Sequence, residues 1–480
     1  MINNGVNSYI LKSKITILRW MWMKLLIIIF ISPMLIIAQN IPTSLDTNDV
    51  ITDSFTKFHS SKSEVKNPWL ATTEVIGLNI LVWANSKYIA KEDWADISLS
   101  TVKKNLQNGF TWDGDSFIMN QFFHPFHGAN YYNSARANGL NFWESIPYAF
   151  GGSLMWELFM ETEPPSYNDF VNTSISGITL GEISNRISNS IIDESTFGME
   201  RILREVTSTI INPMNGFNRL IRGEMWKTGE KRQKTNIHFT FAAGTHSIFI
   251  NKNIDNNEHY LTLRGNLDYG NQFEVNKHKN PFDFFTVQVE ANLRNGDDIW
   301  AIIASGVITD SKIKLFDYSN NIIGVYKEID IYFNDVYKFS STSISSQLVN
   351  TTKLSSNLKM QNYFGLSLII MGATNSAYAN EVNKDYNLGP GISGKIGINL
   401  KFDENASLYL NYKGNWIHTL SGAESDEFIG LLNSGFSYNL FSQSHIGIEY
   451  LIYERFGDYK HFPNTKDSNS ALRFYIKQVI

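Results

Sequence analysis

The chain has 480 residues, a formal net charge of −5 and 18% charged residues. Phosphate binding requires a basic surface, so this composition argues against nucleic acid as a partner. The absence of cysteine excludes disulfides, thiolate metal sites, cysteine nucleophiles and a lipidated N-terminal cysteine. A mean hydropathy of −0.20 is too polar for a bundle of membrane-spanning helices, but it fits a membrane barrel with alternating apolar and polar residues.

The N-terminal region reads as a secretory signal followed by a linker. Lys12, Lys14, Arg19 and Lys24 precede a mostly apolar run at residues 25–37. This run is shorter than the roughly 20 residues that a membrane-spanning helix needs. We therefore predict a signal peptide over residues 1–38, with an N-terminal anchor helix as the disfavoured alternative. Residues 39–68 are polar and are predicted to form a linker.

Helical periodicity dominates from residue 69 to residue 223, which we predict to form a helical domain. Residues 70–89 are apolar but interrupted by Glu74, Asn79 and Asn85, which favours a helix buried in protein over one facing lipid. Residues 142–160 are apolar nearly all round and predict burial on most sides. Ser166 followed by Asp169 resembles a capping box and predicts a helix start.

Two helices in this domain have further features. Residues 173–192 carry a stripe of small residues that predicts close packing with another helix. The stripe consists of Gly177, Gly181, Ser184 and Ser188. Glu182 and Arg186 lie four residues apart on the same helix. Residues 199–211 contain the pairs Glu200/Arg204 and Arg201/Glu205, and this helix should end at Asn212-Pro213.

The stretch from residue 110 to residue 139 has an unusual density of polar and aromatic side chains. Pro125 is expected to push His124 out of helical geometry. A short helix should therefore end near Phe123, and a second should run from about residue 129 to residue 138 and stop at Gly139.

Residues of this stretch and of the helices after it carry a family resemblance. The ordered set is Trp112, Asp113, Asp115, Phe117, Asn120, His124, Pro125, His127, Gly128, Tyr131, Ala135, Arg136 and Gly139, followed by Trp156-Glu157, Pro165-Ser166, Asp169, Gly181-Glu182, Arg186, Asn212-Pro213, Gly216-Phe217 and Arg219-Leu220. It resembles the core signature of the domain-of-unknown-function family 3943, found in envelope proteins of Gram-negative bacteria. The resemblance covers roughly residues 69–223. It implies an envelope compartment and no particular activity, since none is established for the family.

The second half of the chain has the period of β-strands. Apolar and polar residues largely alternate in residues 261–269, 285–293, 392–402, 408–416, 446–452 and 472–476. Several of these strands reach the nine residues that a tilted membrane-crossing strand requires. A soluble β-sandwich normally has shorter strands. We therefore predict an α+β protein in which an outer-membrane β-barrel of about 12 antiparallel strands, residues 236–480, follows the helical domain.

His124 and His127 are the candidates for chemistry. They could bind a metal ion or act as a general base near Asp113, Asp115 or Glu157. The spacing does not fix a coordination geometry, so we favour a structural role in which His124 caps a helix and His127 hydrogen-bonds across the bundle. Asp115, or Ser116 beside it, is expected to cap a helix and not to start a calcium loop. No metal site and no cofactor are predicted.

The remaining polar candidates are expected to bind a ligand or to pair with each other inside the domain. They are Asn120, Tyr131, Arg136, Glu182 and Arg186. Arg136 could hold a phosphate or lipid headgroup. The favoured alternative is that Arg136 neutralises a buried carboxylate such as Glu157 or Glu182.

Two functions follow from the sequence. The first is an exported outer-membrane barrel with a structural, transport or assembly role, whose helices pack in the lumen or at the periplasmic mouth. The second is a membrane-embedded enzyme that acts on lipid or another envelope substrate, with His124, His127 and Glu157 as catalytic candidates. Outer-membrane lipid is the expected partner, with other envelope proteins as further candidates.

Overall fold

The computed structural model describes residues 66–230, 236–250, 257–294, 299–315, 319–403, 405–441 and 443–480. The predicted signal peptide and residues 39–65 of the predicted linker lie outside these ranges. The chain divides into two compact units. One comprises residues 64–185 and 234–480, and the other includes residues 186–233.

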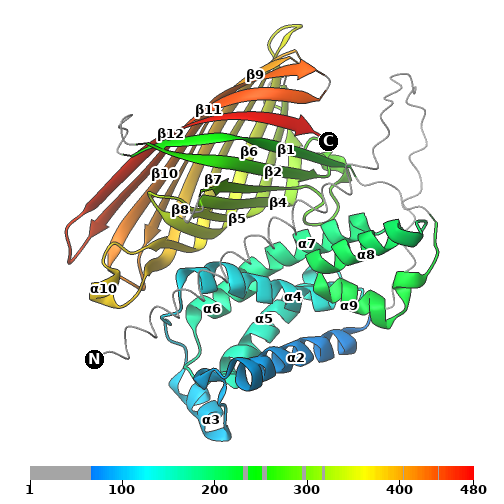
Figure 1. Ribbon diagram of the computed structural model, residues 1–480, viewed down its shortest axis with the longest axis vertical. Helices are drawn as coiled ribbons and strands as arrows, with labels where there is room; N and C mark the ends of the chain where they lie inside the picture. Colours follow the sequence, from blue (N-terminus) through cyan, green and yellow to red (C-terminus); the bar gives the residue numbers. More distant parts are fainter. Residues whose placement is uncertain are drawn as a thin grey trace. The chain divides into compact units, whose positions relative to one another are not determined.

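Twelve antiparallel strands form a closed barrel, as the period-two pattern predicted (Figure 1). Each strand pairs with its neighbours in sequence, and β1 pairs with β12 to close the sheet. The strands are β1 Ile237–Phe249, β2 Asn257–Tyr269, β3 Phe285–Leu293, β4 Ile299–Ile313, β5 Ser319–Phe333, β6 Lys338–Lys353, β7 Leu358–Asn375, β8 Tyr386–Phe402, β9 Ala406–His418, β10 Ser425–Phe441, β11 Ser444–Tyr459 and β12 Thr465–Val479.

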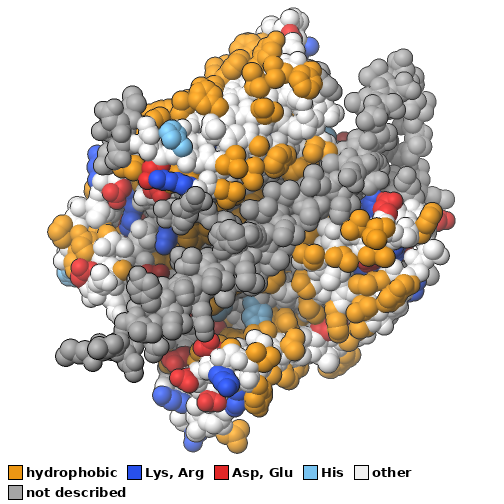
Figure 2. Space-filling model, viewed as in Figure 1, with side chains coloured by type: hydrophobic (Ala, Val, Ile, Leu, Met, Phe, Trp, Pro, Cys, Tyr) orange, Lys and Arg blue, Asp and Glu red, His pale blue; other side chains and the backbone are white. Residues whose placement is uncertain are grey.

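The outer wall of the barrel is apolar and the lumen is polar. Figure 2 shows hydrophobic side chains gathered over the strands. The exposed ones on β7 to β12 include Phe364, Leu366, Leu368, Ile392, Ile396, Leu408, Leu410, Phe436, Ile446, Ile448, Phe474 and Ile476. Residues between them point into the lumen, such as Lys395 between Ile396 and Gly394 on β8. This alternation is typical of strands with lipid on one side.

The helices precede the strands in the chain. They are α2 Pro68–Ala84, α3 Leu99–Asn108, α4 His124–Ala137, α5 Phe142–Phe159, α6 Tyr167–Val171, α7 Gly177–Ile191, α8 Gly198–Ile211 and α9 Pro213–Ile221, with the short helix α10 Ala379–Val382 between β7 and β8. Two π-helical turns, η3 Met119–Phe123 and η4 Asn172–Ser176, lead directly into α4 and α7. None of the described helices is long and apolar enough to span a membrane.

The predicted break at the His-Pro corner is wrong. His124 is helical, with φ −61° and ψ −48°, and α4 starts there and not near residue 129. The wider π-turn η3 provides room for the proline ring, whose missing N–H would otherwise interrupt the hydrogen-bond ladder. The predicted helix end is confirmed, because α4 ends at Ala137 and Gly139 has a left-handed φ of 79°.

The small-residue stripe of α7 packs closely against another helix, as predicted. A Cβ atom built on Gly128 of α4 would lie 1.7 Å from the carbonyl oxygen of Thr173. One on Gly177 would lie 2.6 Å from the carbonyl carbon of Gly128. Glycine at both positions therefore permits the two backbones to touch.

Two helices that the sequence predicts to be buried, α2 and α5, are only partly buried. In α2, Glu74 and Asn79 are buried, while Ile80 and Leu81 are exposed. In α5, Glu157 is buried and Trp143 is 58% exposed. The polar residues therefore point inward and an apolar face points outward, because the buried polar groups find hydrogen-bond partners inside the domain.

The helical segment up to residue 185 contacts the outer wall of the barrel. Phe117 packs edge-on against Phe333 of β5 and Tyr386 of β8, at centroid distances of 5.3 and 5.9 Å. Ser340 Oγ of β6 donates a 3.0 Å hydrogen bond to Gln121 Oε1. Phe122 and Leu180 pack against Ile302, Ile329 and Ile331. These contacts lie on the outer wall at one end of the barrel, where β5 ends and β8 begins, and not in the lumen, one of the two expected positions.

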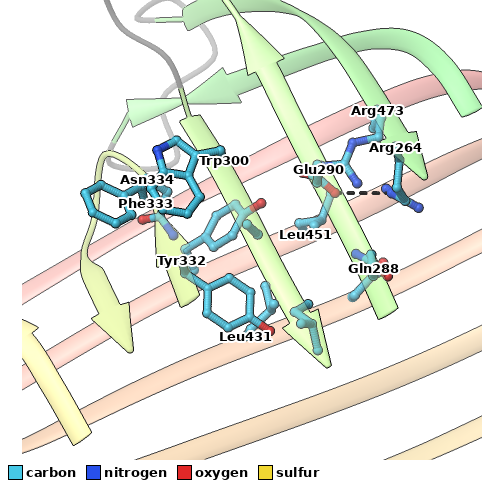
Figure 3. Close-up of a pocket in the computed structure, with 14 residues that line it drawn as sticks. Arg264, Gln288, Glu290, Trp300, Tyr332, Phe333, Asn334, Leu431, Leu451 and Arg473 are labelled. Carbon is cyan, nitrogen blue, oxygen red and sulfur yellow. Dashed lines mark hydrogen bonds and ion pairs between the residues drawn. The ribbon is translucent and has the colours of Figure 1, made fainter. Parts of the chain in front are cut away.

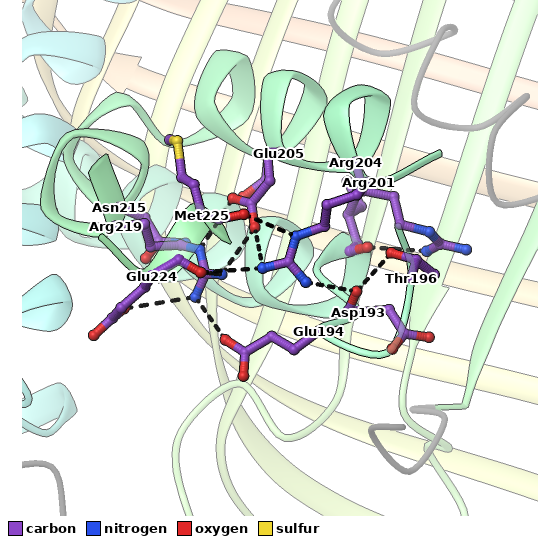
Figure 4. A network of polar contacts seen from close by, with 12 residues as sticks. Asp193, Glu194, Thr196, Arg201, Arg204, Glu205, Asn215, Arg219, Glu224 and Met225 are labelled. Carbon is purple, nitrogen blue, oxygen red and sulfur yellow. Dashed lines mark hydrogen bonds and ion pairs between the residues drawn. The ribbon is translucent and has the colours of Figure 1, made fainter. Parts of the chain in front are cut away.

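The second unit is held together by arginines on α8 and α9 (Figure 4). Arg219 binds Glu205 at 2.8 Å and Glu194 at 3.2 Å. Arg201 and Arg204 form the predicted pairs with Glu205 and Glu200, both at 2.9 Å. Asn212 ends α8, as the sequence predicted, and its side chain also caps α9. The arginines also bind backbone carbonyls, so this network is structural.

Candidate functional site: a polar cluster around His124

A cluster of polar side chains lies where the loop before η3 meets α4, α5 and the start of α6. Asn168 Nδ2 donates to Asp113 Oδ1 at 2.6 Å and to Asn120 Oδ1 at 2.7 Å. Lys384, from the loop between β7 and β8, donates to the carbonyl oxygen of Asp113 at 2.6 Å. These bonds fix the loop that carries Asp113 and Asp115.

His124 faces two carboxylates from this position. Its Nε2 lies 3.3 Å from Asp169 Oδ1 and 3.7 Å from Asp115 Oδ2. The Nε2 atom is buried and has no hydrogen-bond partner among the described residues. The three side chains offer ligand atoms that all lie within 4.8 Å of one another. Ser166 caps α6, as predicted. The side chain of Asp169 faces His124 and does not complete a capping box with Ser166.

Burial and neighbouring charges shift the pKa values in this cluster. Burial lowers the pKa of His124, but nearby carboxylates, with Asp169 first, outweigh it and raise the value to about 9. Burial raises the pKa of Glu157 to about 7, although the backbone N–H of Ser166 opposes the shift. Burial and the charge of Glu157 raise the pKa of Glu161 to about 10. The cluster therefore holds more carboxylates than its cations can neutralise.

His127 does not face the carboxylates. Its ring packs against Tyr131 at a centroid distance of 4.7 Å and against Trp156 at 5.4 Å. Burial, together with the charge of His124, lowers its pKa to about 3. In the described part of the chain His127 forms no ion pair, and its Nε2 has no hydrogen-bond partner. His127 is therefore placed as a packing residue, and its candidate role as a general base has no support. In the favoured alternative His127 hydrogen-bonds across the bundle, but Nε2 forms no such bond with the described residues.

The remaining candidate residues form hydrogen bonds and ion pairs within the helical domain. Arg136 binds Glu182 through Nε at 2.9 Å and Nη2 at 3.3 Å, which confirms the favoured internal pairing. Tyr132 Oη donates to the same carboxylate at 2.8 Å. The hydroxyl of Tyr131 donates to Asn79, and the amide of Asn120 bonds within the cluster. Arg186 lies in α7, where its carbonyl accepts the hydroxyl of Ser190.

The lumen contains a second polar arrangement, in which two arginines and two glutamates form a closed ring. Arg264 of β2 binds Glu449 of β11 at 2.8 Å and Glu290 of β3 at 3.1 Å. Arg473 of β12 binds Glu449 at 2.6 Å and also binds Glu290. Figure 3 shows Arg264, Glu290 and Arg473 directed into a cavity that Tyr332 and Leu451 also line.

Further contacts cross the lumen. Lys413 of β9 binds Asp330 of β5 at 2.6 Å, and Lys395 of β8 binds Glu328 of β5. The ring of Tyr337, in the turn between β5 and β6, meets that of Tyr453 on β11 at 6.2 Å. Both tyrosines belong to a buried apolar cluster that draws residues from strands all round the barrel. Side chains of the barrel itself therefore fill the lumen at this level.

Sequence reasoning missed several of these residues. Asp169 was interpreted as a helix cap, and Asn168 and Lys384 were not selected at all. The lumen charges carry a detectable signal, because Lys395, Lys413 and Glu449 each occupy a polar position between apolar neighbours in an alternating strand. The partners of Lys395 and Lys413 carry no such signal, since each of these pairs joins strands that are not consecutive in the chain.

The site lies in a segment with a known family signature. Residues 109–214 match the family model described as a domain of unknown function (DUF3943). This confirms the family resemblance over residues 109–214, a shorter range than the residues 69–223 expected from the sequence. The DUF3943 segment contains His124, Asp169 and all other members of the cluster except Lys384. No curated protein matches the chain.

The barrel half is similar to solved porins and channels. An anion-selective porin from Comamonas acidovorans has 8% identity and a TM-score of 0.23, with 52% of this chain and 100% of that chain covered. The outer membrane channel DcaP of Acinetobacter baumannii has 10% identity and a TM-score of 0.26, with 52% and 99% covered. An outer membrane channel from Pseudomonas putida F1 has 8% identity and a TM-score of 0.27, with 52% and 97% covered. At these values the similarities carry no inference about activity.

The geometry of the strands shows the type of barrel. Twelve strands close on themselves, the outer wall is apolar and the lumen holds charged side chains. The protein is an outer-membrane-type β-barrel with a helical DUF3943 segment before it.

Proposed function

We propose that this protein is an exported outer-membrane scaffold whose barrel is closed in its resting state and holds the DUF3943 segment at the membrane. Its partners are outer-membrane lipid, against the apolar wall, and other envelope proteins. The predicted signal peptide and the apolar outer wall support this location. The observation that carries the proposal is the filled lumen.

One group of lumen contacts lines the path of a solute and another crosses it. The lining group is the ring of Arg264, Glu290, Glu449 and Arg473, in which each arginine binds both glutamates and which joins neighbouring strands on one side of the barrel. The crossing group is the contact of Tyr337 with Tyr453, within an apolar cluster that draws residues from strands all round the barrel. A diffusion pore needs a continuous water-filled path, and large barrels leave one because their strands outnumber those found here.

The experiment is to measure ion conductance after reconstitution in planar lipid bilayers. The wild-type protein should give no stable conductance steps. The double variant Tyr337→Ala/Tyr453→Ala removes two rings from the apolar cluster and should conduct. The matched control Leu366→Ala removes bulk from the outer wall and should remain closed. The shift between heated and unheated samples on a gel reports that each variant is a folded barrel.

Wild-type conductance at the level of a general porin would overturn the closed state. Wild-type protein that shows no heat shift and remains soluble without detergent would overturn the outer-membrane location. A closed wild type together with a conducting double variant would support both the closed state and the outer-membrane location.

A further inference from the structure

The cluster around His124 combines several acidic groups with few positive ones. The carboxylates are Asp113, Asp115, Glu157, Glu161 and Asp169, and the cations near them are His124 and Lys384. Glu157 and Asp169 are nearly fully buried, at 1% and 5% exposure. Buried carboxylates without a compensating cation are costly, so this arrangement calls for additional positive charge or for bound protons.

The direction of His124 Nε2 provides an independent observation. The atom is buried and lies within 3.7 Å of both aspartates, yet it makes no hydrogen bond to either. Nε2 therefore points between the two carboxylates. A histidine placed to form a simple ion pair would direct its N–H along the line to one oxygen. An imidazole nitrogen that faces a space between two carboxylates has the arrangement of a metal ligand.

We propose that Asp115, His124 and Asp169 bind one divalent transition-metal ion, of which Zn²⁺ is the reference case. Ligands at about 2.0–2.2 Å from zinc lie about 3.3–3.6 Å apart in a tetrahedron. The distances from His124 Nε2 to Asp169 Oδ1 and Asp115 Oδ2 are 3.3 and 3.7 Å. The ligand oxygens of Asp115 and Asp169 lie within 4.8 Å of each other, so the exposed Asp115 side chain moves towards Asp169 to close the site around an ion.

The donor set decides the class of metal. One imidazole nitrogen and two carboxylates suit Zn²⁺, Mn²⁺ or Fe²⁺, whereas Ca²⁺ and Mg²⁺ prefer oxygen ligands throughout. Three protein ligands leave at least one coordination position for water or another ligand. The side chain of Asp115 is 54% exposed and that of Asp169 is 6% exposed, so the ion enters from the side of Asp115.

The neighbouring residues hold the ligands in place. Asn168 Nδ2 donates to Asp169 Oδ1 at 3.1 Å and to Asp113 Oδ1 at 2.6 Å. This amide therefore orients one ligand and also the loop that carries Asp115. Hydrogen bonds of this kind position metal ligands in many proteins. The proposal replaces the sequence-based expectation that the protein has no metal site, and it does not depend on the closed lumen.

The test uses the full-length protein, folded in detergent, stripped with a chelator and titrated with Zn²⁺. Wild type should retain one equivalent per chain after gel filtration, measured by elemental mass spectrometry. His124→Gln and Asp169→Asn should lose this equivalent. Asp115→Asn changes an exposed side chain, keeps the fold intact and should weaken Zn²⁺ binding by roughly tenfold or more. Co²⁺ should give visible ligand-field absorption that His124→Gln abolishes.

The matched control is His418→Gln, because His418 Nδ1 lies 2.9 Å from Asp426 in an exposed pair to which the described residues add no third ligand. It should bind Zn²⁺ as wild type does. Unchanged stoichiometry and affinity in Asp115→Asn and Asp169→Asn would overturn the site, as would loss of binding in His418→Gln. If His124→Gln shows no heat shift on a gel and is therefore misfolded, the result for Asp115→Asn decides the question.

Discussion

The guanidinium of Arg264 on β2 binds both carboxylate oxygens of Glu449 on β11, across the two intervening strands β1 and β12. The two residues are 185 positions apart in the chain. Their contact exists only because β1 pairs with β12 and closes the sheet. The lumen charges therefore depend on barrel closure, and they also stabilise it.

Replacement of Glu449 by glutamine should destabilise the barrel by about 3–5 kcal/mol, because Arg264 and Arg473 would lose their shared anionic partner while buried. The measurement is urea unfolding in detergent, followed by the heat-dependent shift on a gel. The control is Glu424→Gln, which breaks an exposed pair with Lys460 and should leave the unfolding midpoint unchanged. Equal midpoints for wild type and Glu449→Gln would contradict a structural role for the lumen ring.

Replacement of Gly128 by alanine should disrupt the crossing of α4 and the turn before α7. The added methyl group would meet the carbonyl of Thr173, a backbone atom that cannot move aside like a side chain. We expect a loss of about 1–3 kcal/mol or more from overpacking. Limited proteolysis of residues 66–185 measures this loss. Gly151→Ala is the control, since its added methyl group would meet open space and should not destabilise the domain.

Replacement of Leu366 by arginine should oppose membrane insertion. Leu366 is 59% exposed on the outer wall of β7, and arginine facing the middle of a bilayer costs about 2–4 kcal/mol in a barrel. Folding into lipid vesicles, measured by the gel shift, should fall for Leu366→Arg. Leu354→Arg, in the turn between β6 and β7, should fold normally. Efficient insertion of Leu366→Arg would show that this wall does not face lipid.

The loop between β2 and β3 should loosen as the pH rises. Burial lowers the pKa of His278, but its 2.8 Å hydrogen bond to Asp310 and the charge of Asp283 give a net upward shift. A raised folded pKa means that the stabilisation is complete below about pH 6.5, the usual histidine value, and is lost as the pH passes the raised value. As the pH rises, hydrogen exchange of residues 270–284 should therefore increase more in wild type than in His278→Gln. A constant difference between the two proteins at all pH values would contradict this linkage.

The difference between predicted and observed helices has a local cause. The sequence placed a break at Pro125 because proline disfavours a helical residue before it. The structure keeps His124 helical by inserting the π-turn η3 before it. The same continuous helix directs His124 towards Asp169. A rule that considers only neighbouring residues cannot predict this, because the π-turn depends on how the helices pack.

The alternation and length of the strands predicted the barrel. Period two is a property of a single strand, and each strand longer than a sandwich strand carries it without reference to the others. The small-residue stripe of α7 and the end of α4 before Gly139 could likewise be predicted from the sequence, since both follow from local sterics. The family signature at residues 109–214 also required only the order and spacing of residues.

Only the tertiary structure decided which charged residues meet. Asp115, His124 and Asp169 come from a loop, from α4 and from α6, and Arg264 meets Glu449 through barrel closure. Hydrophobic patterning specifies that a residue is inside or outside, but it does not specify the partner across the interior. Strand register and helix crossing set those distances, and electrostatic interactions between buried groups depend steeply on them.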